Sequence, residues 1–433
     1  MKLTIHRGSK EVGGSCVEVE ADGSRIVVDI GLPLFDAERQ AVDSFALRRM
    51  STEELASKSI LPGVNGLFEG NPKPDAILLS HAHLDHTGLL DHTQPEIPIY
   101  ASSGTSKMML AGKLFAMQVE LPRDRFKEVT AGRLITIGGF KITGYSVDHS
   151  IYGCLAYLVE AQGKSLLYTG DLRLHGRKPG MGRSLVKALQ GRTINAMIME
   201  GTHFGLADGH DVTEYELEEE IVQKVREAPG LILASFSPQH VDRLVAFIRA
   251  AMKTDRIFVA DVYTAVVLHL LGTEIGGPVP GAGNSLRVYF PSTFVGTAKE
   301  KNLANLVDRF RSVQITIEEI QKSPEKFVMV YRPSMQIDFG DKLPEQSVCL
   351  YSRWTGYLEH PDWKRTAAAL KAVSGRIIEV HTSGHILSRD IVPFVNAIGP
   401  KAVIPIHTFE PEQFQAHFRN VTLAEDGVPF EIA

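Results

Sequence analysis

The sequence has few cysteines and no long apolar run. Its three cysteines, among 433 residues, stand apart from one another in apolar segments, which excludes a disulfide-rich secreted scaffold and is typical of buried thiols in a reducing compartment. No stretch approaches the ~18 consecutive apolar residues of a membrane-spanning helix. The first residues, Met1 to His6, carry no apolar signal core and go directly into a strand pattern. We therefore expect a cytoplasmic protein that does not use a membrane.

An excess of positive charge is also missing. The 46 Lys and Arg residues are outnumbered by 51 Asp and Glu residues, and the formal net charge is −5. This balance argues against a globally basic nucleic-acid binder but does not exclude one, because a local basic groove or bound metal ions can meet phosphates. With 44% hydrophobic residues, a chain of this length is sufficient for two or three domains with a sizeable core.

The most informative segment that is present is residues 81–86, with the sequence His-Ala-His-Leu-Asp-His. It follows the apolar run 76–79, which is typical of a buried strand, so its polar side chains lie where that strand ends. Active sites of α/β folds are built at such ends. Imidazole and carboxylate are ligands that Zn²⁺ takes in sites that keep a position open for water. A solvated turn tolerates single histidines, but this density of ligand types predicts a metal site.

Five further polar residues end or interrupt apolar runs in the same way. A charged group in such a place must be paired or must bind metal. Each residue on its own can be explained as structural. Together with residues 81–86 they predict a two-metal site that is assembled from distant segments. These residues are Asp29, His149, Asp171, Glu200 and His407.

The pattern of expected elements changes near residue 208 and changes back near residue 370. The first part has short strands and turns, with a polar excursion at 36–70 and a helix-like stretch at 106–119. From 208 onward strands and helices alternate, which predicts a parallel sheet, and residues 276–283 are expected to form a loop. Histidines at strand ends then reappear. The simplest arrangement is an α/β protein in which one domain interrupts another.

These motifs resemble those of the β-CASP branch of the metallo-β-lactamase fold, which contains RNase J and the endonuclease subunit of the pre-mRNA cleavage and polyadenylation factor. The similarity extends over essentially the whole chain. It implies an αββα metallo-β-lactamase sandwich made of residues 1–205 and 369–433, with an inserted parallel α/β β-CASP domain at 206–368. Asp29 resembles part of the opening strands, residues 81–86, His149 and Asp171 resemble the second, third and fourth motifs, and Glu200, His385 and His407 resemble motifs A, B and C.

The resemblance also implies two zinc ions per chain and a role for each side chain. Asp171 would bridge the ions, and Asp29 would orient a ligand imidazole. Asp85, Glu200 and His385 would act in catalysis, and His385 would stabilise or protonate the leaving oxygen. One zinc would be held by His81, His83 and His149, and the other by Asp85, His86 and His407.

The histidine at motif C favours RNA as the substrate, because DNA-directed relatives carry valine there. The resemblance therefore implies a zinc-dependent ribonuclease that cuts single-stranded RNA, by preference as an endonuclease. RNase J has a serine two places after the motif B histidine that helps to hold a 5′-phosphate, but here that place is Leu387. Candidate substrate contacts are Ser383, Gly384, Ser388, Arg353 and Trp354; the last two either contact a single strand or belong to an ordinary turn.

Three other functions remain open at this point. A DNA nuclease of the same chemistry would differ only in its substrate. A small-molecule hydrolase is disfavoured by the large insertion, which suits a polymer in the cleft. A catalytically dead scaffold is disfavoured because every ligand of the motifs is intact. No coiled-coil seam stands out in the sequence, and a homodimer is compatible with it.

Overall fold

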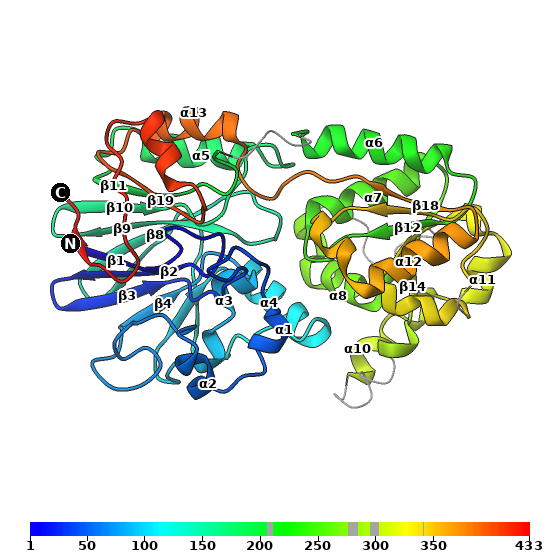
Figure 1. Cartoon of the computed structure of the whole chain (residues 1–433), viewed down its shortest axis with the longest axis horizontal. Helices are drawn as coiled ribbons and strands as arrows, with labels where there is room; N and C mark the ends of the chain where they lie inside the picture. The colour runs from blue at the N-terminus through cyan, green and yellow to red at the C-terminus, as the bar shows by residue number, and fades with distance from the viewer. Residues whose placement is uncertain (206–210, 276–284, 295–302, 341) are drawn as a thin grey trace. The chain divides into compact units, whose positions relative to one another are not determined.

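The chain forms two compact units, which the computed structural model describes for residues 1–205, 211–275, 285–294, 303–340 and 342–433 (Figure 1). Unit 1 consists of Met1–Gly209 and Ser383–Ala433, and unit 2 is the intervening segment His210–Thr382. The chain therefore leaves unit 1 once and returns to it once. The loop expected at 276–283 lies outside the described residues.

The first sheet of unit 1 has seven strands and mixes antiparallel with parallel pairs. In spatial order the strands are β20 (Phe430–Glu431), β1 (Lys2–Arg7), β2 (Cys16–Ala21), β3 (Ser24–Val28), β4 (Ala76–Leu78), β5 (Ile99–Ala101) and β6 (Phe126–Glu128). The pairs from β20 to β3 are antiparallel, and those from β3 to β6 are parallel. Because β3 and β4 are parallel, Asp29 and the segment 81–86 follow them at the same edge of the sheet.

The second sheet of unit 1 has six strands and is also mixed. In spatial order the strands are β19 (Val403–Ile406), β11 (Ala196–Glu200), β10 (Lys164–Tyr168), β9 (Leu155–Ala161), β8 (Phe140–Ser146) and β7 (Leu134–Ile137). One apolar core cluster contains Ile5 and Val17 of the first sheet together with Ile142 and Tyr157 of the second. The two sheets are therefore joined through their buried faces, as in a β-sandwich.

Helices cover the sandwich of unit 1 on both sides. Figure 1 shows α5 (Gly180–Leu189) and α13 (Ser388–Ile398) side by side along the second sheet. On the side of the first sheet lie α1 (Ser44–Leu47), α2 (Thr52–Ser57), α3 (Leu84–Thr87) and α4 (Ser103–Phe115), and 3₁₀ turns occur at Leu90–His92 and Pro411–Ala416. The helix expected at 106–119 begins earlier than predicted, because the Ser102 hydroxyl caps it by accepting a hydrogen bond from the Thr105 amide. It also ends earlier, at Phe115.

Unit 2 contains a single seven-stranded sheet in which every described pair is parallel. In spatial order the strands are β15 (Gln314–Ile315), β14 (Leu286–Tyr289), β13 (Ile257–Asp261), β16 (Phe327–Val330), β12 (Ile232–Ser235), β17 (Val348–Tyr351) and β18 (Arg376–Glu379). The chain runs from β12 toward β15 and then returns through β16 to β18. The connections therefore change direction at the adjacent strands β16 and β12, which makes a topological switch point.

The helices of unit 2 alternate with its strands, as the sequence predicted. They are α6 (Glu214–Glu227), α7 (Val241–Lys253), α8 (Val262–Leu271), α10 (Ala304–Asp308), α11 (Ile317–Lys322) and α12 (Pro361–Ala372), with 3₁₀ turns at Gly272–Ile275, Arg311–Val313, Pro324–Lys326, Pro333–Phe339 and Thr355–Glu359. Polar side chains fix where several of them begin. Thr213 and Glu216 form a capping box at α6, and the Asp261 carboxylate accepts the Thr264 amide at α8.

A buried ion pair links these elements of unit 2. Both Arg243 on α7 and Glu214 on α6 are fully buried, and their side chains are joined at 3.0 Å. The same guanidinium also donates to the carbonyl oxygens of Val380 and Thr382, which follow β18. Removing one partner of such a pair leaves an uncompensated buried charge, so it fixes how the last segment of unit 2 is held.

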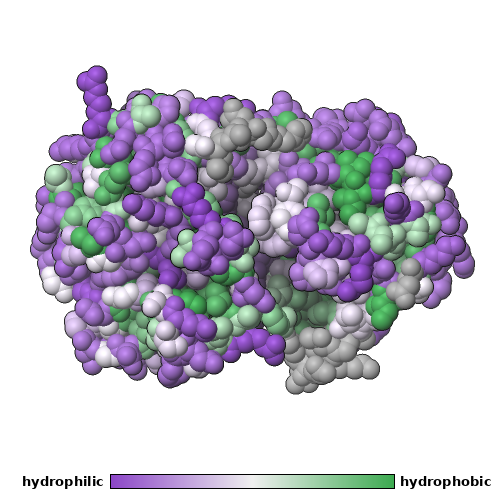
Figure 2. All heavy atoms as spheres, in the orientation of Figure 1, coloured by the Kyte–Doolittle hydropathy of each residue, from purple (hydrophilic) through white to green (hydrophobic). Residues whose placement is uncertain are grey.

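The α/β fold class predicted from the sequence is confirmed: two mixed sheets form a sandwich in unit 1, and a parallel sheet forms unit 2. None of the described helices is both long and apolar enough to cross a membrane. The face of the molecule seen in Figure 2 is mostly hydrophilic, and hydrophilic side chains interrupt its hydrophobic areas.

Candidate metal centre

The segment 81–86 lies in the turn between β4 and α3 of unit 1. Strand β4 is buried along its whole length, so the chain leaves the core at Ser80 and turns at once into the short helix α3. His81 and His86 are fully buried, and Asp85 is 8% exposed. Helix α3 holds Asp85 and His86 in its first turns, while His81 and His83 precede the helix. The turn thus directs four side chains of one short segment into the protein.

Three imidazoles form the first group of candidate ligands. His81 Nε2 lies 3.1 Å from His83 Nδ1, and His83 Nδ1 lies 3.2 Å from His149 Nε2. All three nitrogens lie within 4.8 Å of one another. His149 comes from the segment that follows β8, so the second sheet brings it to the end of β4. Three converging imidazole nitrogens can hold one zinc ion.

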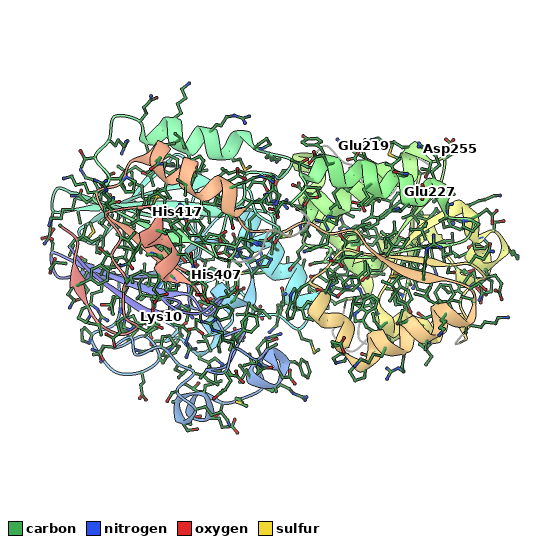
Figure 3. The ribbon with its side chains drawn as sticks, turned by 45° about the horizontal axis from the view of Figure 1, so that its top comes forward. Lys10, Glu219, Glu227, Asp255, His407 and His417 are labelled. Atoms are coloured by element: carbon green, nitrogen blue, oxygen red, sulfur yellow. The ribbon has the colours of Figure 1, made fainter. Side chains whose placement is uncertain are left out.

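The second group contains two carboxylates and two imidazoles, which are Asp85, His86, Asp171 and His407. His407 Nε2 lies 3.1 Å from Asp85 Oδ2, and His86 Nε2 lies 3.1 Å from Asp171 Oδ2. His407 follows β19, which pairs in parallel with β11, and Figure 3 shows it in the interior of unit 1. The parallel pair therefore carries a residue from the end of the chain to the edge where Glu200 ends β11.

Asp171 lies between the two groups. Its Oδ2 is 3.7 Å from His81 Nε2 and 3.8 Å from His149 Nε2 in the first group. The same oxygen is 3.7 Å from His407 Nε2 in the second group. A single carboxylate oxygen that faces both groups has the position expected of a bridging ligand in a two-metal site.

The outward-facing ring nitrogens of these histidines are held by hydrogen bonds. His86 Nδ1 donates to Asp29 Oδ2 at 2.8 Å, and His149 Nδ1 donates to the Gly384 carbonyl oxygen at 2.5 Å. His81 Nδ1 lies 2.9 Å from the Ser80 hydroxyl, and His407 Nδ1 lies 2.8 Å from the Thr202 hydroxyl. Each bond fixes the tautomer so that the inward nitrogen keeps its lone pair, as a metal ligand requires.

Asp29 is the centre of this supporting network. Its carboxylate accepts hydrogen bonds from the Ser80 amide and hydroxyl at 2.7 Å each, and from the Tyr168 hydroxyl at 2.7 Å. Asp29 and His407 both have left-handed backbone conformations, with φ values of 59° and 55°. Such conformations are uncommon for residues with a side chain, and they are found where the surrounding structure fixes a functional group.

The electrostatics of the cluster fit a bound cation. Burial and neighbouring imidazoles hold the pKa values of His81 and His149 well below the ordinary value, so both rings are neutral and able to coordinate. Burial also lowers the pKa of His86, but the carboxylates of Asp171, Asp29 and Asp85 outweigh it and raise this pKa well above its ordinary value. These carboxylates attract positive charge, which either a proton or a metal ion can supply.

His385 lies beside the second group and contacts Glu200. Its Nδ1 is 3.3 Å from Glu200 Oε1 and 3.7 Å from Asp171 Oδ2. Glu200 is fully buried, and its Oε1 also accepts the amide of Ile386. Burial lowers the pKa of His385, but the two carboxylates outweigh it and raise this pKa to about 9. An imidazolium next to the candidate metal ligands can donate a proton or stabilise negative charge.

The predicted substrate contacts separate into two places. Ser383, Gly384 and Ser388 belong to unit 1, where the Ser383 hydroxyl accepts the His385 amide and the Ser388 hydroxyl donates to the His203 carbonyl oxygen. Arg353 and Trp354 belong to unit 2. The three residues from unit 1 thus hold the loop that carries His385.

Sequence reasoning missed several supporting residues. Ser80, Tyr168 and Thr202 each hydrogen-bond to a candidate ligand or to Asp29. His203 and His175 both hydrogen-bond to Ser383, through its hydroxyl at 2.6 Å and its carbonyl oxygen at 2.9 Å. A usable signal was the position of Ser80, Tyr168 and Thr202 within two residues of a predicted site residue or at a strand end, but that position does not say which partner each would find.

The comparison with known families agrees with this geometry. Residues 53–209 match the family described as a Beta-lactamase superfamily domain, and this range contains most of the candidate ligands. The chain carries a metallo-β-lactamase domain. The predicted membership of the metallo-β-lactamase superfamily is confirmed, and a buried His/Asp cluster in this fold supports a metal-dependent hydrolase.

Several curated relatives are similar to this chain at low identity. A Ribonuclease J from Mycolicibacterium smegmatis is 21% identical over 463 residues, which cover 100% of this chain and 75% of that protein. A Ribonuclease J from Sinorhizobium meliloti is 27% identical, over 46% of this chain and 35% of that protein. An RNase J-like protein from Methanocaldococcus jannaschii is 24% identical, over 60% of this chain and 58% of that protein. The chain thus spans less than two thirds of the last two relatives.

A solved structure has the same fold over nearly the whole chain. A protein of unknown function from Enterococcus faecalis V583 superposes with a TM-score of 0.79, covering 99% of both chains at 22% sequence identity. At this identity the similarity shows the fold alone. It supports the two-unit α/β architecture described above.

Proposed function

We propose that this protein is a zinc-dependent ribonuclease that hydrolyses phosphodiester bonds of single-stranded RNA. The observation that carries the proposal is the placement of Asp171 Oδ2 between two groups of ligand atoms, with His385 Nδ1 3.7 Å away. Nitrogen and carboxylate oxygen donors in this number suit zinc. The proposal of RNA rests on the names of the distant relatives and on the histidine at position 407, where the resemblance favours RNA.

The two ions, when bound, would supply a nucleophile at neutral pH and would offset the negative charge of the phosphate. One ion would be held by His81, His83 and His149. The other ion would be held by Asp85, His86 and His407. Asp171 would be a ligand of both ions. Asp29, Ser80 and Thr202 keep the imidazoles in the tautomer that coordinates. The protein's contribution at this point is geometry that exists before the substrate arrives.

The leaving oxygen needs a proton, and His385 is placed to give it. Glu200 Oε1 accepts a hydrogen bond from His385 Nδ1, and its charge favours the imidazolium. As the P–O bond breaks, its electron pair moves to the leaving oxygen, and the imidazolium proton follows. Glu200 is buried and does not face solvent, so it orients His385 instead of acting directly on RNA.

An endonucleolytic mode is supported by the loop after His385. Leu387 is 1% exposed and precedes α13, so it offers neither a hydroxyl nor an accessible surface to a 5′-phosphate. The next residue, Ser388, uses its hydroxyl to donate to the His203 carbonyl oxygen at 2.6 Å. Both side chains near the place of the RNase J serine are therefore occupied within the protein.

The test is digestion of internally and 5′-end-labelled RNA by the full chain with added zinc. We expect internal cuts that do not depend on whether the 5′ end carries a monophosphate or a triphosphate. The Asp171→Asn variant should be inactive, and His417→Ala, which removes an exposed imidazole of the same unit, should be fully active. Release of mononucleotides only from the monophosphate form would overturn the endonucleolytic mode. Activity that survives Asp171→Asn would overturn the proposal itself.

A DNA nuclease is the second candidate, because nothing in the ligand geometry distinguishes the two polymers. The same assay with DNA of matched sequence decides between them. Faster cleavage of DNA than of RNA would replace RNA by DNA in the proposal and leave the metal chemistry unchanged.

A further inference from the structure

Two arginines of unit 2 follow strands β16 and β17 at the carboxyl edge of the parallel sheet. Arg332 comes two residues after β16, and Arg353 comes two residues after β17. Strand β12 separates these strands, and the connections of the sheet change direction between β16 and β12. In open α/β sheets, ligands bind outside the carboxyl ends of the strands at such a switch point. The sequence alone did not bring these two residues together, because the order of the strands is not visible in it.

Arg332 has donors that no described residue uses. Its Nε donates to Asp261 Oδ2 at 2.7 Å, but neither of its terminal nitrogens hydrogen-bonds to a described residue. Nη2 is buried, while the side chain as a whole keeps 27% of its surface exposed. The guanidinium also lies over the ring of Tyr263, 5.2 Å from its centroid. Arg332 is thus held in place by Asp261 and Tyr263 and keeps hydrogen-bonding capacity for an anion.

Arg353 carries a charge that no described carboxylate compensates. The structure gives it no hydrogen bond or ion pair to a described residue, and its guanidinium lies 5.2 Å from the ring centroid of Tyr357. Burial lowers the pKa of Arg353, and the nearby charge of Arg332 lowers it further, which places the two cations in one local field. Asp261 is the carboxylate paired with Arg332, and its other oxygen is occupied by Thr264. Both oxygens of the carboxylate that pairs with Arg332 are therefore already occupied within unit 2.

Two aromatic side chains stand next to this pair on the surface of unit 2. Trp354 and Tyr357 are each 50% exposed, and their rings meet edge to face with centroids 5.3 Å apart. The Trp354 indole packs so closely on Gly356 that a Cβ atom there would lie 2.4 Å from the ring. The Tyr351 hydroxyl further fixes this turn by donating to the Trp354 carbonyl oxygen. The indole is thus a large exposed ring whose position is set in advance.

We propose that Arg332 and Arg353 form a phosphate-binding site for single-stranded RNA, with Trp354 as the surface on which an adjacent base stacks. Planar guanidinium groups match phosphate oxygens with paired hydrogen bonds, and an exposed indole stacks on any base. The site contacts the backbone and a base face, so it is indifferent to sequence. The choice of RNA rests on the proposed function, whereas the phosphate site itself rests on unit 2 alone.

Binding of a fluorescein-labelled, phosphorothioate-substituted single-stranded RNA to the full chain tests the site. We expect Arg353→Ala to weaken binding about 10-fold and to reduce the salt dependence by about one released ion. The matched control is Arg376→Ala, which removes an exposed guanidinium from the first residue of β18. This residue lies at the amino edge of the sheet, whereas Arg353 lies at the carboxyl edge. Equal losses for Arg353→Ala and Arg376→Ala, or no loss for Arg353→Ala, would overturn the site.

Three more variants separate its parts. Arg332→Lys keeps the charge but loses the planar guanidinium group, and we expect this variant to bind both RNA and inorganic tripolyphosphate more weakly. Trp354→Ala and Gly356→Ala should weaken RNA binding several-fold and leave the affinity for tripolyphosphate unchanged, because only the base-stacking surface is altered. A Trp354→Ala variant that lost tripolyphosphate to the same degree as RNA would contradict the assigned roles. An unchanged melting temperature identifies variants that are folded.

A parallel assay keeps this inference distinct from the proposed function. Hydrolysis of bis(p-nitrophenyl) phosphate needs the metal centre but is too small to use a strand-binding surface. If that hydrolysis depends on Asp171 while RNA binding does not change in Arg353→Ala, the proposed nuclease activity is supported and the phosphate-binding site is refuted. If RNA binding depends on Arg353 while no phosphodiester is cut, the phosphate-binding site is supported and the proposed nuclease activity is refuted. Tighter binding of DNA than of RNA would contradict the RNA assignment for this surface.

Discussion

At the scale of single residues, the candidate centre combines groups that need different charge states. His81 and His149 are neutral because burial disfavours their protonation, whereas His385 is held as an imidazolium by Glu200 and Asp171. Such a separation of the pKa values of neighbouring groups suits the coordinating and proton-donating roles proposed for them. The hydrogen bonds to their outward nitrogens make this assignment independent of side-chain rotation.

His385→Ala tests the proton-donating role through the leaving group. We expect RNA cleavage to fall by about 10²–10⁴, because an alkoxide leaving group needs a proton. Hydrolysis of bis(p-nitrophenyl) phosphate should fall much less, since p-nitrophenolate leaves without protonation. The ratio of the two losses in kcat is the measurement. Equal losses for both substrates would assign His385 to binding or structure and not to proton transfer.

The two groups of ligands also predict how metal is lost. The protein as isolated should contain two zinc ions per chain by elemental analysis. His81→Ala and His407→Ala should each retain about one ion, because each removes a ligand from a different group. A strong chelator should abolish hydrolysis, and added zinc should restore it. One ion in the unaltered protein, or loss of both ions in both variants, would contradict a centre with two separable groups.

At the scale of elements, the candidate metal centre depends on backbone packing between the strand ends. Residue 31 follows β3, and a Cβ atom on Gly31 would lie 1.7 Å from the carbonyl oxygen of Asp85. The Ser15 amide donates to this same carbonyl oxygen at 3.0 Å. Only glycine therefore allows the chain after β3 to pass the turn that carries Asp85 and His86.

Gly31→Ala should consequently displace Asp85 and weaken zinc binding by about 10–100-fold, as expected when the support of a ligand is disturbed. Titration with a zinc-binding dye measures the change. Gly63→Ala is the matched control, because no atom lies within 4 Å of the place of its Cβ and its backbone is not left-handed. An unchanged zinc affinity in Gly31→Ala would mean that the turn moves without cost to the ligands.

The strands of the first sheet carry a buried carboxylate whose pKa makes stability depend on pH. Glu18 on β2 lies between His6 on β1, at 2.8 Å, and Arg25 on β3, whose Nε donates at 2.7 Å. Burial raises the pKa of Glu18, but these hydrogen bonds outweigh burial and hold it below the ordinary value of 4.5. A carboxylate with a lowered pKa in the folded state stabilises the protein above pH 4.5.

This stabilisation should disappear as the pH falls from 4.5 through the lower pKa of the folded state. Glu18→Gln should lower the free energy of unfolding at neutral pH by about 1–3 kcal/mol and should flatten its pH dependence in the acid range. Urea unfolding at several pH values gives both quantities. Glu20→Gln lies on the same strand, and among the described residues Glu20 forms an ion pair only with the partly exposed Lys2, so this change should alter stability by less than about 0.5 kcal/mol. A pH dependence that is unchanged in Glu18→Gln would refute the assignment.

At the scale of the whole molecule, the sequence was sufficient for the fold class and for collecting the candidate ligands. Residues 81–86 are neighbours in the chain, and His149, Asp171 and His407 each end an apolar run, so local pattern and resemblance identified them. The residues that hydrogen-bond to the candidate ligands could not be identified in this way. Thr202 and Ser80 reach their histidine partners only because of the order of strands in two sheets. The pairing of Arg332 with Asp261 depends likewise on which strand lies next to β16.

The position of β19 has a consequence for how the protein is made. His407 contacts Asp85 although it lies 322 positions later in the chain, and β19 covers the outer edge of β11. At about 5–20 residues per second, a ribosome needs roughly 16–64 s to add that length. From the point at which β11 has been made until β19 follows, the nascent chain presents Asp85 and Asp171 without their last imidazole and β11 without its outer neighbour. An unpaired strand edge of this kind attracts other chains, so newly made copies are most exposed to aggregation after β11 and before β19 has been made.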